Sequence, residues 1–238
     1  LDADTGKLKW HYQFTPHDLY DYDATQIPVL LDATWDGRPR KLLVQANRNG
    51  FLYVLDRVDG TFLSAKPFGN VTWATAIDAK GKPVLKTDLK PGPDGTRVCP
   101  AAGGLTNWYS PSYSPATQLL YVATSNECDV FSSSPQPYRA GHDFLGSIYV
   151  PEPDQRPSGA LKAIDVLSGQ EKWSFPFFTN PNGGALSTAG GLVFAGDSDG
   201  NFIALDATTG RDLWHVQLGA AIYSAAITFA LDGKQYVV

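Results

Sequence analysis

The chain has 238 residues, of which 23 are glycine and 17 are proline, and aromatic residues make up 12% of it. This composition favours many short strands and turns over long helices. The formal net charge of −5, without any run of lysine or arginine, argues against a nucleic-acid-binding surface, and no apolar run approaches the roughly 18 residues that span a membrane.

Four segments share one pattern, in which an apolar strand end is followed by an aspartate, a short turn that closes on glycine, and a second strand. They are LDADTGKLKW (1–10), VLDRVDGTFL (54–63), AIDVLSGQEKW (163–173) and ALDATTGRDLW (204–214). Tryptophan follows the glycine by four positions at Trp10, Trp173 and Trp214, whereas the second segment has Ser64 there. The pattern predicts β-hairpins with glycine at positive φ and a large aromatic side chain that a neighbouring unit must bury.

The spacing of these repeats predicts the fold. Successive repeat glycines are 54, 109 and 41 positions apart, and the shorter spacings match the blade period of a β-propeller. The double spacing leaves room for one blade without the motif, around residues 119–123. Further strands are expected at residues 41–46, 51–55, 191–195 and 201–205. We therefore predict an all-β fold, in which residues 1–238 form one partial β-propeller domain of about four blades.

An acidic segment follows the first repeat. Residues 15–23 read TPHDLYDYD and contain Asp18, Asp21 and Asp23. Three ionised carboxylates so close together repel one another, so a hard cation with oxygen ligands is expected to balance them. The alternative is an aspartate-rich surface turn without a ligand.

The two cysteines, Cys99 and Cys128, are 29 positions apart and have no CxxC motif or histidine cluster beside them. A metal site is therefore not expected, and a structural disulfide fits better. A disulfide would place the protein in the periplasm or outside the cell. Two free buried thiols remain the alternative.

The tryptophan-bearing repeats and the segment TPHDLYDYD together resemble the large subunit of quinoprotein alcohol dehydrogenases of the methanol dehydrogenase type. These enzymes use pyrroloquinoline quinone (PQQ). The resemblance runs over essentially the whole chain and covers roughly the C-terminal half of an eight-bladed propeller. It implies that the chain, which has no methionine and begins inside a repeat, is an internal piece of a longer protein, truncated at both ends.

The resemblance assigns a role to two of the acids. The family motif TPHDxxDY makes Asp21 the catalytic base, close to the metal and to the substrate hydroxyl. The position of Asp23 is acidic in lanthanide-dependent members and is a small residue in the calcium-dependent methanol enzymes. We therefore expect Asp21 and Asp23 to be metal ligands and the ion to be a lanthanide, with Ca²⁺ as the alternative. Asp18 is expected to be structural.

The resemblance also names residues that contact the cofactor. Arg48 would lie close to the quinone oxygens, Asn107 would hydrogen-bond the quinone, and Asn182 with Gly183 would form a further contact segment. The methanol enzymes have tryptophan at the position of Asn182, so the chain departs from them there. Cys99 and Cys128 bracket Asn107 with the spacing of a family disulfide.

The expected activity is oxidation of a primary alcohol to an aldehyde, with hydride transfer to PQQ and a cytochrome c-type electron acceptor in a bacterial periplasm. A homodimer of the full-length protein is left open. The other family metal ligands, a glutamate and an asparagine, would precede Leu1, so this chain alone is expected to be inactive. The alternatives are a non-enzymatic propeller scaffold in outer-membrane protein assembly, and a propeller glycosidase or lyase that uses paired carboxylates.

Overall fold

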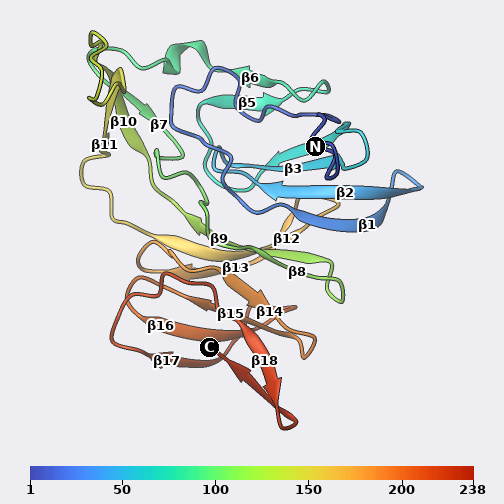
Figure 1. Ribbon diagram of the computed structural model, residues 1–238. Helices are drawn as coiled ribbons and strands as arrows, with labels where there is room; N and C mark the ends of the chain where they lie inside the picture. The colour runs from blue at the N-terminus through green and yellow to red at the C-terminus, as the bar shows by residue number, and fades with distance from the viewer.

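The computed structural model describes the backbone of residues 1–238 and every side chain except that of Thr87 (Figure 1). Three four-stranded antiparallel sheets follow one another along the chain. The first consists of β1 (Val29–Trp35), β2 (Arg38–Ala46), β3 (Phe51–Asp56) and β4 (Phe62–Pro67). The second consists of β8 (Ser112–Ser114), β9 (Leu119–Ser125), β12 (Gly159–Asp165) and β13 (Glu171–Phe177). The third consists of β14 (Ala185–Ser187), β15 (Leu192–Gly196), β16 (Asn201–Asp206) and β17 (Asp212–Gln217).

Three smaller sheets complete the strands of the described chain. They are the pair β5 (Ala74–Ile77) and β6 (Pro83–Leu85), the triplet β7 (Thr96–Val98), β10 (Asp129–Ser133) and β11 (Ser147–Pro151), and the hairpin β18 (Thr228–Leu231) and β19 (Lys234–Val237). The only helix in the described part is the 3₁₀ turn η1 (Thr87–Leu89). No described helix could therefore cross a membrane. The prediction of an all-β, partial propeller is confirmed.

The three large sheets stack face to face like neighbouring propeller blades (Figure 1). Because their central strands are covered on both faces, β3 and β9 are continuously buried instead of alternating. One apolar cluster joins the first sheet to the second and includes Leu42, Val54, Leu120 and Ile164. Another joins the second sheet to the third and includes Tyr121, Leu161, Val193 and Leu205.

The repeat tryptophans lock one repeat onto the next. The indole Nε1 of Trp10 donates to the carbonyl of Arg57 at 3.2 Å, and its ring lies against Gly60, which has a φ of +79°. A side chain at Gly60 would overlap the ring, since an added Cβ would be 2.7 Å from it. Glycine therefore serves both the turn and the close approach.

The same contact recurs one repeat further along. Trp173 Nε1 donates to Ala207 at 3.1 Å, and its ring lies against Gly210. Trp214 is 51% exposed in the described chain. The predicted first hairpin, residues 1–10, was only half right: its turn forms, with Gly6 N bonded to Asp2 O, but its flanks pair with no described strand. A strand requires a hydrogen-bonded neighbour, and none lies beside it here.

Antiparallel order gives each large sheet two unlike ends. The turn end, as we call it, holds the turns between first and second and between third and fourth strands, namely residues 36–37, 57–61, 115–118, 166–170, 188–191 and 207–211. The loop end holds the second-to-third connections and the entries to the first strands, namely residues 11–28, 47–50, 68–111, 126–158, 178–184 and 197–200. All long connections of the three sheets, and strands β5, β6, β7, β10 and β11, belong to the loop end.

Candidate functional site

The acidic segment leads into β1 at the loop end and is fixed by one of its own carboxylates. Asp18 accepts hydrogen bonds from the backbone amides of Tyr20, at 2.9 Å, and Tyr22. Burial raises the pKa of the Asp18 carboxyl, although both amide hydrogen bonds oppose the rise. Both oxygens of the Asp18 carboxylate therefore hold the backbone of the segment in place.

The two tyrosines anchor the segment in the protein. The Tyr20 hydroxyl donates to Leu89 O at 2.9 Å, and the Tyr22 hydroxyl donates to Pro100 O. Both rings are buried in an aromatic cluster with Trp73. The residues between and beyond them, Asp21 and Asp23, are left exposed.

Asp21 pairs with Arg48, which lies in the turn between β2 and β3. The distance between Asp21 Oδ2 and Arg48 Nη2 is 3.0 Å. The Asp21 side chain is 52% exposed, whereas that of Arg48 is only 12% exposed. Asp21 has a φ of 65°, a left-handed conformation that is uncommon for residues other than glycine and that recurs at functional sites.

Arg48 is held by the loop between β7 and β8. Its Nε donates to Ala102 O at 2.9 Å, and its Nη2 donates to the same oxygen. The amide of Arg48 donates to Gln26 Oε1 at 3.1 Å. Gly104 packs so closely that an added Cβ would lie 2.1 Å from Arg48 Cγ. The guanidinium is thus clamped between this loop and the acidic segment.

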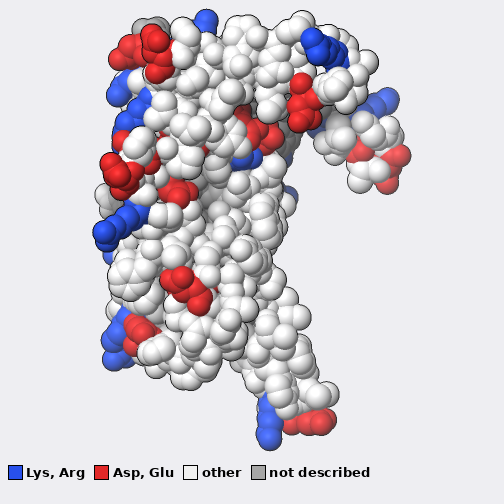
Figure 2. Space-filling model, turned by 90° about the vertical axis from the view of Figure 1, so that its left-hand side faces the viewer, with Lys and Arg blue, Asp and Glu red and all other residues white. Residues whose placement is uncertain are grey.

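Asp21 and Asp23 share one cavity of about 590 Å³ at the loop end. The other residues that line it are Asp18, Leu19, Tyr20, Lys90, Pro91, Phe131, Ser133, Leu145, Gly146, Ser147 and Tyr149. Figure 2 views the loop end and shows acidic and basic side chains gathered over its upper half, with fewer over the lower half. The cavity therefore combines two exposed carboxylates with apolar side chains such as Leu19, Phe131 and Leu145.

The remaining predicted cofactor residues lie at the same end and form no hydrogen bond with the side chains of Asp21 or Arg48 in the described chain. Asn107 Nδ2 donates to Gly103 O at 2.8 Å. Asn182 Nδ2 donates to Ser198 Oγ at 2.9 Å. Gly183 is buried, and an added Cβ would be 3.3 Å from Ile222 O. Their roles toward a cofactor stay predictions.

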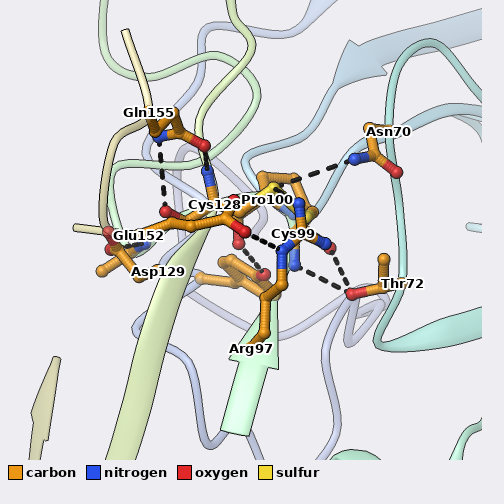
Figure 3. The surroundings of a disulfide bond; sticks show 11 residues. Asn70, Thr72, Arg97, Cys99, Pro100, Cys128, Asp129, Glu152 and Gln155 are labelled. Atoms are coloured by element: carbon orange, nitrogen blue, oxygen red, sulfur yellow. Dashed lines mark hydrogen bonds and ion pairs between the residues drawn. A yellow bond between two sulfur atoms is a disulfide. The ribbon is translucent and has the colours of Figure 1, made fainter. Parts of the chain in front are cut away.

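Cys99 and Cys128 form a disulfide that ties the end of β7 to the start of β10 (Figure 3). The amide of Cys99 donates to Thr72 Oγ1 at 2.8 Å, and that of Cys128 donates to Gln155 Oε1 at 2.8 Å. The bond therefore fixes one end of the loop that carries Ala102, the residue that holds Arg48.

Sequence reasoning missed one buried acid, Asp129, which follows Cys128. Its carboxylate accepts the Ala102 amide at 2.8 Å, and only 6% of the residue is exposed. Burial raises the pKa of the Asp129 carboxyl. The available signal in the sequence was a charged residue directly after a cysteine. The sequence does not show its partner, because Ala102 is 27 positions away.

The donors fit a hard cation and an oxygen-rich anionic cofactor, but only in part. Asp21 and Asp23 offer carboxylate oxygens, the ligand type of Ca²⁺ and of ions like it, and Arg48 offers a fixed cation. Among the described residues, however, no group of three or more His, Cys, Asp or Glu side chains could hold a metal. Ca²⁺ takes roughly 6–8 oxygens, so further ligands are needed.

Comparison with known proteins identifies the family. Residues 1–66 and 176–237 match the family model described as PQQ: glucose/ethanol/alcohol dehydrogenase, beta-propeller domain. The whole chain is 40% identical to quinohemoprotein alcohol dehydrogenase ADH IIB of Pseudomonas putida, over 35% of that protein's length. It is also 40% identical to 1-butanol dehydrogenase (cytochrome c) of Thauera butanivorans, over 36% of its length.

A solved structure agrees with these relatives. A europium-containing methanol dehydrogenase superposes on 98% of this chain with a TM-score of 0.92 and 37% identity, and 42% of that protein is covered. The chain thus spans little more than a third of the curated relatives it matches. With this sequence and structural similarity over essentially its whole length, the chain belongs to the PQQ-dependent alcohol dehydrogenase β-propeller family.

Proposed function

We propose that the full-length protein oxidises a primary alcohol to an aldehyde with PQQ as the cofactor, and that residues 1–238 supply part of its propeller. The observation that carries the proposal is the Asp21–Arg48 pair at the loop end, 3.0 Å apart, with Asp21 lining a cavity. The names of the relatives support the substrate class, since they are alcohol and 1-butanol dehydrogenases.

Asp21 is the proposed catalytic base. Its Oδ2 is bonded to Arg48, and no described group bonds Oδ1, which leaves that oxygen available to a substrate hydroxyl. Removal of the hydroxyl proton makes hydride leave the carbinol carbon more easily. The exposed Asp21 side chain, on a segment fixed by Asp18 and the two buried tyrosines, supports this proposed role.

Arg48, Asn107, Asn182 and Gly183 are the proposed cofactor contacts. When bound, PQQ supplies the hydride acceptor, and a metal ion beside it makes the quinone more electrophilic. Arg48 Nη1 has no partner among the described residues, so it is available to a cofactor oxygen. A fixed guanidinium favours negative charge that develops near it.

Asp21 and Asp23 are the proposed metal ligands, and a lanthanide is the favoured ion, with Ca²⁺ as the alternative. Two carboxylates bring more negative charge to the ion than one, which suits a trivalent cation of calcium-like size. The europium-containing structural relative supports this choice. Asp23 is exposed and lines the same cavity as Asp21.

The proposed electron acceptor is a cytochrome c-type protein, which the name of the Thauera relative supports. The proposed location is the bacterial periplasm, since a disulfide joins Cys99 and Cys128 and disulfides persist in oxidising compartments. A homodimer of the full-length protein remains a proposal without a specific contact in its favour.

Reconstitution tests the proposed function. The full-length protein is loaded with PQQ and either Ca²⁺ or a light lanthanide, and dye-linked oxidation of primary alcohols is measured. We expect activity only when PQQ and an ion are both present. Activity without PQQ would refute the proposal, and inactivity under every condition would favour the non-enzymatic scaffold.

The metal assignment is tested with Asp23→Ala. We expect the variant to lose lanthanide-dependent activity selectively, because the second carboxylate is gone. Asp32→Ala is the matched control, since Asp32 is 68% exposed and its ion pair with Arg57 is at the turn end. Equal losses with calcium and with the lanthanide would contradict a selective role for Asp23.

A further inference from the structure

A buried carboxylate lies behind the candidate site. Asp129 begins β10 and directly follows Cys128 of the disulfide (Figure 3). Among the described residues its carboxylate has no ion-pair partner and accepts one hydrogen bond, from the amide of Ala102 at 2.8 Å. Burying an unpaired carboxylate is costly, so a particular role for Asp129 is expected.

Ala102 connects Asp129 to Arg48. The residue is 1% exposed, its N–H donates to Asp129, and its carbonyl accepts from both Nε and Nη2 of Arg48. An anion and a cation thus hold the two polar groups of one buried residue. Hydrogen bonds to ionised groups are shorter and roughly twice as strong as those between neutral groups.

The same guanidinium then reaches Asp21. Arg48 Nη2 contacts both Ala102 O and Asp21 Oδ2, the latter at 3.0 Å. Because these groups share one nitrogen, a shift of the Ala102 carbonyl must shift Nη2 relative to Asp21. The order Asp129, Ala102, Arg48, Asp21 is therefore one continuous chain of contacts from the buried strand to the cavity.

Other contacts hold the neighbouring groups, including the Ala101 carbonyl, which accepts from the Gly104 amide at 2.8 Å, whereas the Ala102 N–H is bonded to Asp129. The amide of Ala101 donates to Glu127 O at 2.9 Å, and the Tyr22 hydroxyl donates to Pro100 O. Asp129 is the one described side chain other than Arg48 that hydrogen-bonds Ala102.

We propose that Asp129 is a positioning residue, which fixes the Ala102 carbonyl and through it aims the Arg48 guanidinium at Asp21. Its importance for catalysis rests on the proposed function, whereas the contact chain itself does not. Without Asp129, the Ala102 N–H loses its hydrogen bond, and the Ala102 carbonyl, which accepts from Arg48, is held less firmly.

Arginine modification tests the proposal without a cofactor. The cofactor-free full-length protein is treated with phenylglyoxal, and the rates at Arg48 and Arg57 are measured by peptide mass spectrometry. Arg57 is the internal control, since it is bound to Leu31 O and Asp32 at the turn end. We expect Asp129→Ala to raise the rate at Arg48 roughly tenfold and to leave Arg57 unchanged.

Two further variants keep the test decisive. Asp129→Asn retains an oxygen that can accept the Ala102 amide, so we expect it to restore most of the protection of Arg48. In Asp129→Ser, the side chain is one bond too short to accept from the Ala102 amide, but it leaves a smaller cavity than alanine does. We therefore expect this variant to fold and to expose Arg48 to the reagent even if the alanine variant does not fold.

An Arg48 rate within about twofold of wild type in the alanine or serine variant would overturn the proposal, given the expected loss of a charge-assisted hydrogen bond. An equal rise at Arg57 would also overturn it, because it would indicate general loosening. Failure of the proposed function would appear instead as inactivity of the reconstituted wild-type protein, with the modification result unaffected.

Discussion

The pKa values of two aspartates at the turn end and of two at the loop end are shifted in opposite directions. At the turn end, the amide and hydroxyl of a threonine in the same turn lower the pKa of Asp59 and of Asp206. At the loop end, burial raises the pKa of Asp18 and of Asp129. Asp59 and Asp206 are thus stabilised as anions by local hydrogen bonds, whereas Asp18 and Asp129 are held where their charge is unfavourable. The loop-end Glu152 differs from these two, because its ion pair with Arg97 lowers its pKa.

This difference separates stability from function within one fold. The turn end repeats the same hydrogen bonds and the same tryptophan–glycine contact, which join the blades. The loop end carries the irregular connections and the buried Asp129, features that cost stability and that concentrate at functional sites. Variants at the two ends should therefore fail in different ways.

The largest expected effect is on catalysis and comes from the loop end. Asp21→Asn should reduce the turnover of the reconstituted full-length enzyme by about 10²–10⁴-fold, the usual contribution of a general base. Its melting temperature should stay unchanged, because the side chain is 52% exposed. Asp59→Asn, at the turn end, is the control and should keep full activity. Retained turnover in the Asp21 variant would contradict its role as the base.

The next effect is on stability and comes from the turn end. Trp173→Ala should lower the free energy of unfolding by about 3–5 kcal/mol, since it removes a buried aromatic ring and leaves Gly210 uncovered. Trp108→Ala is the matched control, because Trp108 is 55% exposed. Denaturant titration distinguishes the two variants. Similar losses would show that the repeat contact does not join the blades.

Loss of the disulfide should have a smaller effect that is confined to the loop end. Replacing both Cys99 and Cys128 by serine should cost roughly 3 kcal/mol, the loop-closure value for such a separation. Hydrogen exchange should accelerate in residues 96–107 and 128–133, which the bond connects, and not at residues 207–211. Uniform acceleration across both ends would argue against a local role.

The smallest effect is a difference in pH dependence. The lowered pKa of Asp206 means that its stabilisation is complete above the unfolded value of about 3.9 and is lost as the pH falls through the folded value. The raised pKa of Asp18 has the opposite sign, so its contribution falls as the pH rises through the folded value.

Unfolding free energies of wild type, Asp206→Asn and Asp18→Asn, measured from pH 3 to pH 7, check both signs. The stability advantage of wild type over the Asp206 variant should grow as the pH rises, and its advantage over the Asp18 variant should shrink. Parallel curves for the two variants would refute the contrast between the ends.

The structure of the turn end could be predicted from the sequence because its contacts are local and repeated. The glycine of each repeat, the tryptophan four positions later and their spacing predicted the hairpins and the stacking of blades. The loop end was only partly readable. A left-handed Asp21, the clamp on Arg48 and the role of Asp129 depend on contacts 27 or more positions apart, and no periodic pattern encodes them.

The site residues themselves came from resemblance to a family, and the structure adds their arrangement. It brings Asp21, Asp23 and Arg48 to one end of the blades, with Asn107, Asn182 and Gly183 at the same end and not hydrogen-bonded to the side chains of the Asp21–Arg48 pair. Strands β5, β6, β7, β10 and β11 were not expected, since short strands in connections show little alternation.

Equilibrium binding of PQQ to the metal-loaded, cofactor-free full-length protein tests the central claim most directly. Arg48→Ala, at the loop end, should raise the dissociation constant of PQQ roughly tenfold or more, because a charge-assisted contact is lost. Arg57→Ala, at the turn end, should leave it unchanged. Equal affinities in wild type and Arg48→Ala would contradict the assignment of the loop end as the cofactor site.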